Sequence, residues 1–71
     1  MSEEINAPLA GKVMSISVNV GDVVEEDDEI LVLEAMKMET PVYSSGAGTI
    51  KEIRVNQGDS VEEDDVLAII E

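Results

Sequence analysis

The sequence contains no cysteine, histidine, tryptophan or phenylalanine, and Tyr43 is its one aromatic residue. Without cysteine, the chain can form neither a disulfide nor a thiolate metal site, and its redox compartment is not constrained. Without histidine, it lacks the commonest general base and the commonest metal ligand in proteins. No glycine-rich loop of the kind that cradles phosphate groups is present either. These absences argue against an enzyme that performs chemistry with its own side chains.

Basic residues are scarce, since four lysines and arginines stand against 17 acidic residues and give a net charge of −13. Nucleic acids and anionic membranes are bound through lysine and arginine, so the charge argues against both kinds of partner. No apolar run approaches the ~18 residues of a membrane span, and no charged segment followed by an apolar one begins the chain. We expect a cytoplasmic protein that does not insert into membranes and is monomeric as an isolated domain, because like charges repel.

The chain of 71 residues is long enough for one small domain, and its two halves repeat each other at an offset of 37 residues. Residues 11–28 align with residues 48–65 without a gap, and both copies contain Asn-x-Gly-Asp-x-Val-Glu-Glu-Asp-Asp. Two copies are too few for a solenoid. The repeat therefore predicts one domain with a pseudo-twofold axis, in which neither half can bury its apolar face alone.

The residue pattern of each half indicates β-strands. β-Branched residues alternate partly with polar ones near Val13 and Ile50. Turn signals recur every ~8–12 residues, which disfavours helices. Val32 and Leu33 are adjacent, which predicts a strand buried on both faces, as in a flattened barrel or a tight sandwich. Residues 1–4 are expected to form a flexible end.

A single lysine lies at the centre of the sequence, between two methionines. The sequence Ala-Met-Lys-Met at residues 35–38 joins the apolar residues 30–33 to a second extended stretch, residues 40–43. In a chain with so few basic residues, this lysine is better explained as one exposed amine than as part of a basic patch. Two-residue hairpin turns favour Asn-Gly or Asp-Gly because they need positive φ. Met36 and Lys37 in such a turn would imply tolerated backbone strain.

These features resemble the biotin carboxyl carrier family, whose biotinyl domains carry a central Ala-Met-Lys-Met. The resemblance covers essentially the whole chain and is carried by four segments in order: residues 7–13, 20–24, 33–39 and 58–61. It implies an all-β fold and a biotinyl domain over residues 5–71. The implied architecture is a flattened β-barrel (barrel-sandwich hybrid) of two four-stranded antiparallel sheets, with the lysine on an exposed hairpin turn. Because the two halves align without a gap, the chain resembles carriers that lack the inserted "thumb" of some acetyl-CoA carboxylase carriers.

The resemblance implies that Lys37 carries biotin as a covalent amide. The biotin would be a swinging arm that moves a carboxyl group from a biotin carboxylase to a carboxyltransferase or decarboxylase. The implied partners are a biotin protein ligase, a biotin carboxylase and a carboxyltransferase or decarboxylase subunit. The domain is expected to be non-catalytic, because the cofactor supplies the reactivity. The candidate recognition residues surround the lysine: Glu34, Ala35, Met36, Met38 and Glu39.

Two other classes of protein are possible. A lipoyl carrier domain of a 2-oxoacid dehydrogenase complex would share the implied fold, but such domains usually have an acidic residue directly before the lysine, where this chain has Met36. An unmodified structural domain, related to the hairpin modules of efflux adaptors, would lack the centred Ala-Met-Lys-Met. The methionines also have a less specific explanation, since a thioether can fill a gap in the core. The flanking glutamates could likewise be solvated charges.

The acidic clusters at residues 25–28 and 62–65 could suggest calcium, but they lack the spaced ligands and glycine of a known calcium loop. We expect solvated charge and no metal site. The strand that leads to Lys37 starts just after residues 25–28, and about six residues at ~3.3 Å each put that cluster roughly 20 Å from the lysine. A pseudo-twofold axis would place residues 62–65 at the Lys37 end and the chain termini at the far end. The hairpin would then be bordered by negative charge that suits a basic partner face.

Overall fold

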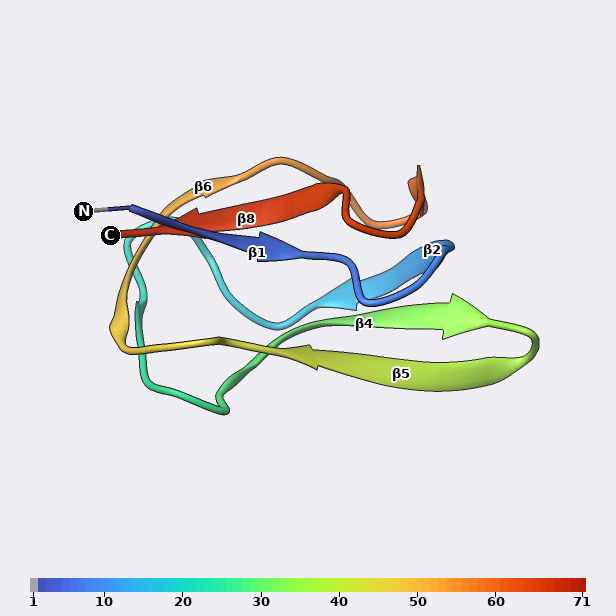
Figure 1. Cartoon of the computed structure of the whole chain (residues 1–71), viewed down its shortest axis with the longest axis horizontal. Coiled ribbons are helices and arrows are strands. Elements are labelled where there is room, and N and C mark those ends of the chain that lie inside the picture. Colours follow the sequence, from blue (N-terminus) through green and yellow to red (C-terminus); the bar gives the residue numbers. More distant parts are fainter. Residues whose placement is uncertain (1) are drawn as a thin grey trace.

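The computed structural model describes residues 2–71, and Met1 lies outside the described part. Within this part the chain forms eight β-strands and no helix (Figure 1). The strands are β1 (Glu3–Asn6), β2 (Gly11–Ile16), β3 (Val23–Val24), β4 (Glu29–Ala35), β5 (Met38–Tyr43), β6 (Gly48–Ile53), β7 (Ser60–Val61) and β8 (Val66–Ile70). The described residues accordingly offer no helix that could cross a membrane. The expected all-β fold class is confirmed.

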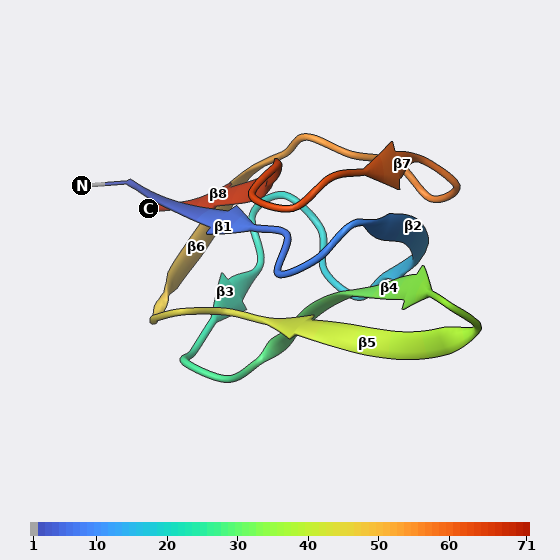
Figure 2. The same cartoon turned by 45° about the vertical axis from the view of Figure 1, so that its right-hand side comes forward.

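The strands form two four-stranded sheets that face each other as a flattened barrel (Figure 2). One sheet has the order β1-β8-β6-β3 and the other has the order β5-β4-β2-β7, with every neighbouring pair antiparallel. Each short strand pairs with a strand from the other half of the sequence, since β3 pairs with β6 and β7 pairs with β2. Each sheet therefore needs strands from both halves, which explains why neither half can bury its apolar face alone.

The predicted pseudo-twofold symmetry is confirmed, because the offset of 37 residues maps β2, β3 and β4 onto β6, β7 and β8. The turns repeat down to single hydrogen bonds. The backbone N–H of Asn19 donates to the Asp22 carboxylate at 2.9 Å, and that of Asn56 donates to the Asp59 carboxylate at 2.9 Å. The glycine of each turn has a φ of 96°, a conformation that a residue with a side chain rarely adopts. The same local chemistry thus builds the same corner twice.

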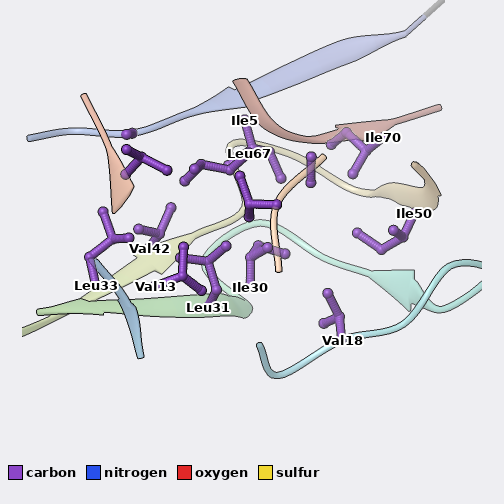
Figure 3. Packing of buried hydrophobic residues seen from close by; sticks show 14 of the residues in the cluster. Ile5, Val13, Val18, Ile30, Leu31, Leu33, Val42, Ile50, Leu67 and Ile70 are labelled. Carbon is purple, nitrogen blue, oxygen red and sulfur yellow. The ribbon is translucent and has the colours of Figure 1, made fainter. Parts of the chain in front are cut away.

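The core consists of aliphatic side chains that converge from both sheets (Figure 3). The expectation that Val32 and Leu33 are both fully buried is wrong for Val32, which is only half-buried. The adjacent buried residues are Ile30 and Leu31, because a bulge in β4 inserts Ile30 between residues that pair with β5. An extra residue in one strand lets two consecutive side chains face the same side. An equivalent bulge in β8 buries Leu67 beside its neighbour.

Two residues of the expected flexible end, residues 1–4, lie in a strand, and Met1 of that segment lies outside the described residues. Glu3 pairs with Ile70 and Glu4 pairs with Ile69, so both belong to β1. The physical reason is that β1 covers the edge of β8 in the same way that β5 covers the edge of β4. β1 also adds Ile5 to the core.

The molecule is elongated, with principal extents of 33 × 17 × 17 Å. The β4–β5 hairpin projects at one end of the long axis, and the start of β1 and the C-terminus lie at the opposite end (Figure 1). The expected placement of the chain ends, away from the central lysine, is therefore confirmed for the described residues. The fold presents one hairpin turn at the extreme of its long axis.

Candidate functional site

The turn of the projecting hairpin consists of Met36 and Lys37 alone, because Ala35 pairs with Met38 across it. Both turn residues have positive φ, 52° for Met36 and 64° for Lys37. Two positive φ values in succession are what a type I′ two-residue hairpin requires, since this turn matches the twist of the strands. Met36 and Lys37 thus form the two-residue turn with positive φ that the sequence suggested, and Lys37 lies exposed at the tip.

The backbone of this turn is strained. A residue with a side chain loses roughly 1–2 kcal/mol in the left-handed region, and only glycine, asparagine and aspartate visit it readily. The other positive-φ positions among the described residues are held by glycine or aspartate: Gly21, Asp27, Gly58 and Asp64. Met36 and Lys37 are the exception to this local rule. Such conflicts between local preference and fold occur mainly at functional sites.

The two methionines beside Lys37 do not pack in the core. The side chain of Met36 is 94% exposed and that of Met38 is 69% exposed. Glu34 and Glu39 are exposed as well, and Ala35 is half-buried. The alternative of core packing therefore fails for both methionines. Exposed thioethers on either side of a lysine form a flexible apolar surface of the kind used for recognition.

A row of exposed side chains crosses the outer face of the second sheet at the base of the hairpin. Glu34 lies opposite Glu39 on β5 and opposite Lys12 on β2, and Lys12 lies opposite Ser60 on β7. Residues directly opposite on neighbouring strands are close on the same face, so the two glutamates repel each other. The tip therefore has negative charge close behind it, with one cation next in the row.

The amine of Lys37 has no ion-pair partner within residues 2–71. Two other basic side chains do have partners, since Lys51 pairs with Glu71 at 3.2 Å and Arg54 pairs with Glu52 at 3.0 Å. Both pairs are half-exposed and contribute little to stability. Lys37 is thus a projecting amine that another molecule can reach.

Gly11 on β2 lies against the backbone of Glu34 at the base of the hairpin. The sequence analysis did not identify it as a site residue. A Cβ atom at Gly11 would lie 2.8 Å from the backbone oxygen of Glu34, which is closer than real contacts allow. Its equivalent, Gly48, shows the same close approach, at 3.0 Å from the backbone oxygen of Glu71. The presence of glycine at both equivalent positions of the repeat could have indicated this close backbone contact. Glycine allows β2 to lie against the end of β4, next to the turn.

Each acidic cluster closes a turn with one of its carboxylates. The N–H of Glu25 donates to Asp28 at 2.8 Å, and the N–H of Glu62 donates to Asp65 at 2.8 Å. No group of three or more metal-ligating side chains gathers anywhere in residues 2–71. The clusters are therefore surface turns in which one carboxylate is already committed to the backbone.

The two clusters lie in opposite halves of the molecule, as the repeat predicts. Residues 62–65 follow β7, which pairs with the start of β2 beside the end of β4, whereas residues 25–28 precede β4 at the end with the termini (Figure 1). The hairpin tip nevertheless extends beyond the loop of residues 62–65 (Figures 1 and 2). The expectation that residues 62–65 border the hairpin tip is therefore corrected, because their negative charge lies behind the tip.

Comparison with known proteins agrees with this geometry. The sequence model of the family described as biotin-requiring enzyme matches residues 3–70. The chain belongs to this family. It is a biotinyl domain, and the all-strand structure has the flattened-barrel architecture that the resemblance implied.

Individual relatives are subunits or parts of larger enzymes. The methylmalonyl-CoA carboxyltransferase 1.3S subunit of Propionibacterium freudenreichii subsp. shermanii is 62% identical over 37 residues, which are 52% of this chain and 30% of that protein. The glutaconyl-CoA decarboxylase subunit gamma of Acidaminococcus fermentans is 46% identical over 41 residues, 58% of this chain and 28% of that protein. The crystal structure of the Kluyveromyces lactis urea carboxylase superposes with a TM-score of 0.93 at 33% identity, covering 99% of this chain and 6% of that one. The matches thus span less than a third of the length of these proteins.

Proposed function

We propose that this biotinyl domain is a biotin carboxyl carrier that holds biotin as an amide on Lys37. It moves a carboxyl group between two active sites of a biotin-dependent carboxylase or decarboxylase. The observation that carries the proposal is the position of Lys37, exposed at the tip of a projecting hairpin, in a turn that requires a positive φ that lysine disfavours. An ordinary surface lysine would require neither the projection nor the strain.

The described residues fit covalent attachment. The amine of an exposed lysine is protonated at neutral pH and must lose a proton before it can attack an acyl carbon. The chain contains no histidine or cysteine to accept that proton, and the neighbours of Lys37 are methionines. The ligase must therefore accept the proton and present biotin as an acyl-adenylate. The amine nitrogen of Lys37 then forms the amide bond while AMP leaves.

The carrier contributes position to this chemistry. A two-residue turn at the end of paired strands fixes the backbone position of the lysine, which lowers the entropic barrier to reaction in a partner's site. Once bound, biotin supplies the ring nitrogen that carries the carboxyl group. The projection of the hairpin lets the tip enter an active site while the body of the domain stays outside (Figure 1).

The proposed partners are a biotin protein ligase, a biotin carboxylase, and a carboxyltransferase or decarboxylase subunit, all in the cytoplasm. Two relatives are named for methylmalonyl-CoA and glutaconyl-CoA, which supports an acyl-CoA as donor or acceptor of the carboxyl group. The recognition surface would consist of Met36 and Met38 at the tip, with Glu34, Ala35 and Glu39 behind them.

Co-expression with a biotin protein ligase is expected to add the mass of one biotin to the chain, as measured by intact-protein mass spectrometry. Streptavidin and anti-lipoate blots of protein from its own host distinguish biotin from lipoate. A carrier of known activity, modified in the same cells, serves as the control for the ligase. Attachment of lipoate, or no attachment when the control carrier is modified, would contradict the proposal.

The asymmetric placement of the acidic clusters predicts an asymmetric effect on association with the ligase. Glu62→Gln/Glu63→Gln is expected to slow the second-order rate of biotinylation about twofold at low salt, because charge in the hairpin half steers a basic partner face. Glu25→Gln/Glu26→Gln removes the same charge at the other end and is the matched control. Asp28 and Asp65 are kept because they close the turns. Equal effects of the two double variants across a salt titration would refute the steering.

A further inference from the structure

Two of the three methionines within residues 2–71 flank the lysine at the hairpin tip. The chain has four methionines and no cysteine, so thioethers are its principal targets for two-electron oxidants. Met36 and Met38 are 94% and 69% exposed, whereas Met14 on β2 is 37% exposed, and Met1 lies outside the described residues. An oxidant in solution therefore reaches the sulfur atoms that flank Lys37 more easily than that of Met14.

The core is built without sulfur. Its buried apolar side chains are all valine, isoleucine, leucine or alanine, as far as the described residues extend. Oxidation of methionine commonly damages proteins by placing a polar group inside a packed core. Here the modified side chains would stay in solvent, so the fold would keep its stability while the surface of the tip changes.

We propose that Met36 and Met38 form a reversible oxidation site that controls the attachment of biotin to Lys37; this inference rests on the proposed function. The oxidant is hydrogen peroxide. One oxygen atom passes from peroxide to each thioether sulfur, the O–O bond breaks, the sulfur loses two electrons to become a sulfoxide, and the peroxide is reduced to water. The two methionine sulfoxide reductases, one for each sulfoxide epimer, restore the thioether. A dithiol supplies the two electrons and two protons and becomes a disulfide, and the sulfoxide oxygen leaves as water.

The geometry explains why oxidation would weaken recognition. The thioethers are the exposed apolar groups that flank the lysine. Beyond them lie the half-buried Ala35 and then the exposed Glu34 on β4, and the exposed Glu39 on β5. Ala35, the apolar neighbour, is half-buried and has only a methyl group as its side chain, so it cannot replace the contact of the thioethers with the ligase. A sulfoxide is a strong hydrogen-bond acceptor, and its burial in an apolar pocket without a donor is unfavourable. Loss of one buried methionine-sized contact corresponds to about tenfold or more in affinity.

The experiment treats the unmodified domain with peroxide, removes the peroxide, and maps the sulfoxides by peptide mass spectrometry before any ligase is added. Met36 and Met38 are expected to be oxidised before Met14. The kcat/KM of biotinylation is expected to fall about tenfold, and the denaturant midpoint of unfolding is expected to stay unchanged. Both reductases together, supplied with a dithiol reductant, are expected to restore the rate. A lowered midpoint after oxidation would overturn the inference, because the sulfur atoms would then support the fold.

Matched variants locate the effect. Peroxide is expected to leave the biotinylation rate of the Met36→Leu/Met38→Leu variant unchanged, whatever that rate is before treatment. The Met14→Leu variant is expected to keep the full sensitivity to peroxide. Sensitivity that persists in the double variant would overturn the inference. If the untreated protein accepts biotin and the oxidised protein accepts it equally fast, the inference fails and the proposed function survives. If the untreated protein accepts no biotin, both fail.

Discussion

Lys37→Arg is expected to abolish biotinylation completely and to leave the fold intact. Arginine keeps the positive charge and the length of the side chain, but its guanidinium stays protonated and offers no free amine for amide formation. The side chain projects from an exposed turn and has no ion-pair partner among residues 2–71, so nothing that stabilises the fold is lost. The intact mass of the variant should equal the mass calculated for the variant without biotin, and its denaturant midpoint should match that of the wild type.

The other two lysines of the chain provide matched controls. Lys12→Arg and Lys51→Arg are each expected to accept one biotin at the wild-type level, because neither residue lies in the hairpin turn. Lys12 lies on the face of β2, and Lys51 is paired with Glu71. Biotin that persists on the Lys37→Arg variant, located by peptide mapping to Lys12 or Lys51, would refute the assignment.

Much of the fold could be predicted because its information is local and occurs twice. In each copy of Asn-x-Gly-Asp, an aspartate side chain accepts a hydrogen bond from the asparagine backbone three residues earlier, and the glycine supplies the positive φ. The hydrogen bond that closes each turn is local, although Gly21 and Gly58 also donate to the distant carbonyl groups of Ile50 and Val13. The pseudo-twofold axis then follows from equal corners at equal spacing, whereas the pairing of β3 with β6 and of β7 with β2 was not predicted.

The features that could not be predicted depend on partners far away in the sequence. The bulge that buries Ile30 together with Leu31 exists because β4 shifts its register against β5. The pairing of Glu3 and Glu4 depends on the far end of the chain, since their partners lie in β8. Local patterns of hydrophobicity cannot contain this information, because it resides in the register between strands.

The candidate site likewise has features that the local sequence predicts and features that depend on distant residues. The isolated lysine, its methionine neighbours and the unfavourable turn are all visible in one short segment of sequence. The row that joins Glu34 to Lys12, and the close approach of Gly11 to the backbone of Glu34, both come from β2, more than twenty positions earlier in the chain. The exposure of Met36 and Met38 could not be decided either, because it depends on how far the hairpin projects beyond the barrel.

The double variant Met36→Asn/Lys37→Gly is expected to be more stable than the wild type by about 1–2 kcal/mol, because Asn-Gly accepts positive φ at both turn positions at little cost. Glycine loses more backbone entropy on folding, by roughly 0.5–1 kcal/mol, which limits the gain. Urea unfolding should show a higher midpoint with an unchanged slope. A gain of this size corresponds to a rise in melting temperature of about 4–8 °C per kcal/mol for a domain this small.

Single variants separate relief of strain from other effects of asparagine. Met36→Asn keeps Lys37 and is expected to give about half of the gain in stability, because one of the two strained positions is relieved. Met38→Asn places the same residue in β5, at a position without positive φ, where no gain is expected. If Met36→Asn stabilises the fold and also slows biotinylation, the natural turn gives up stability in order to present an apolar tip around its lysine. If neither turn variant stabilises the fold, the backbone of the native turn is not strained, and the link between strain and function at this hairpin must be abandoned.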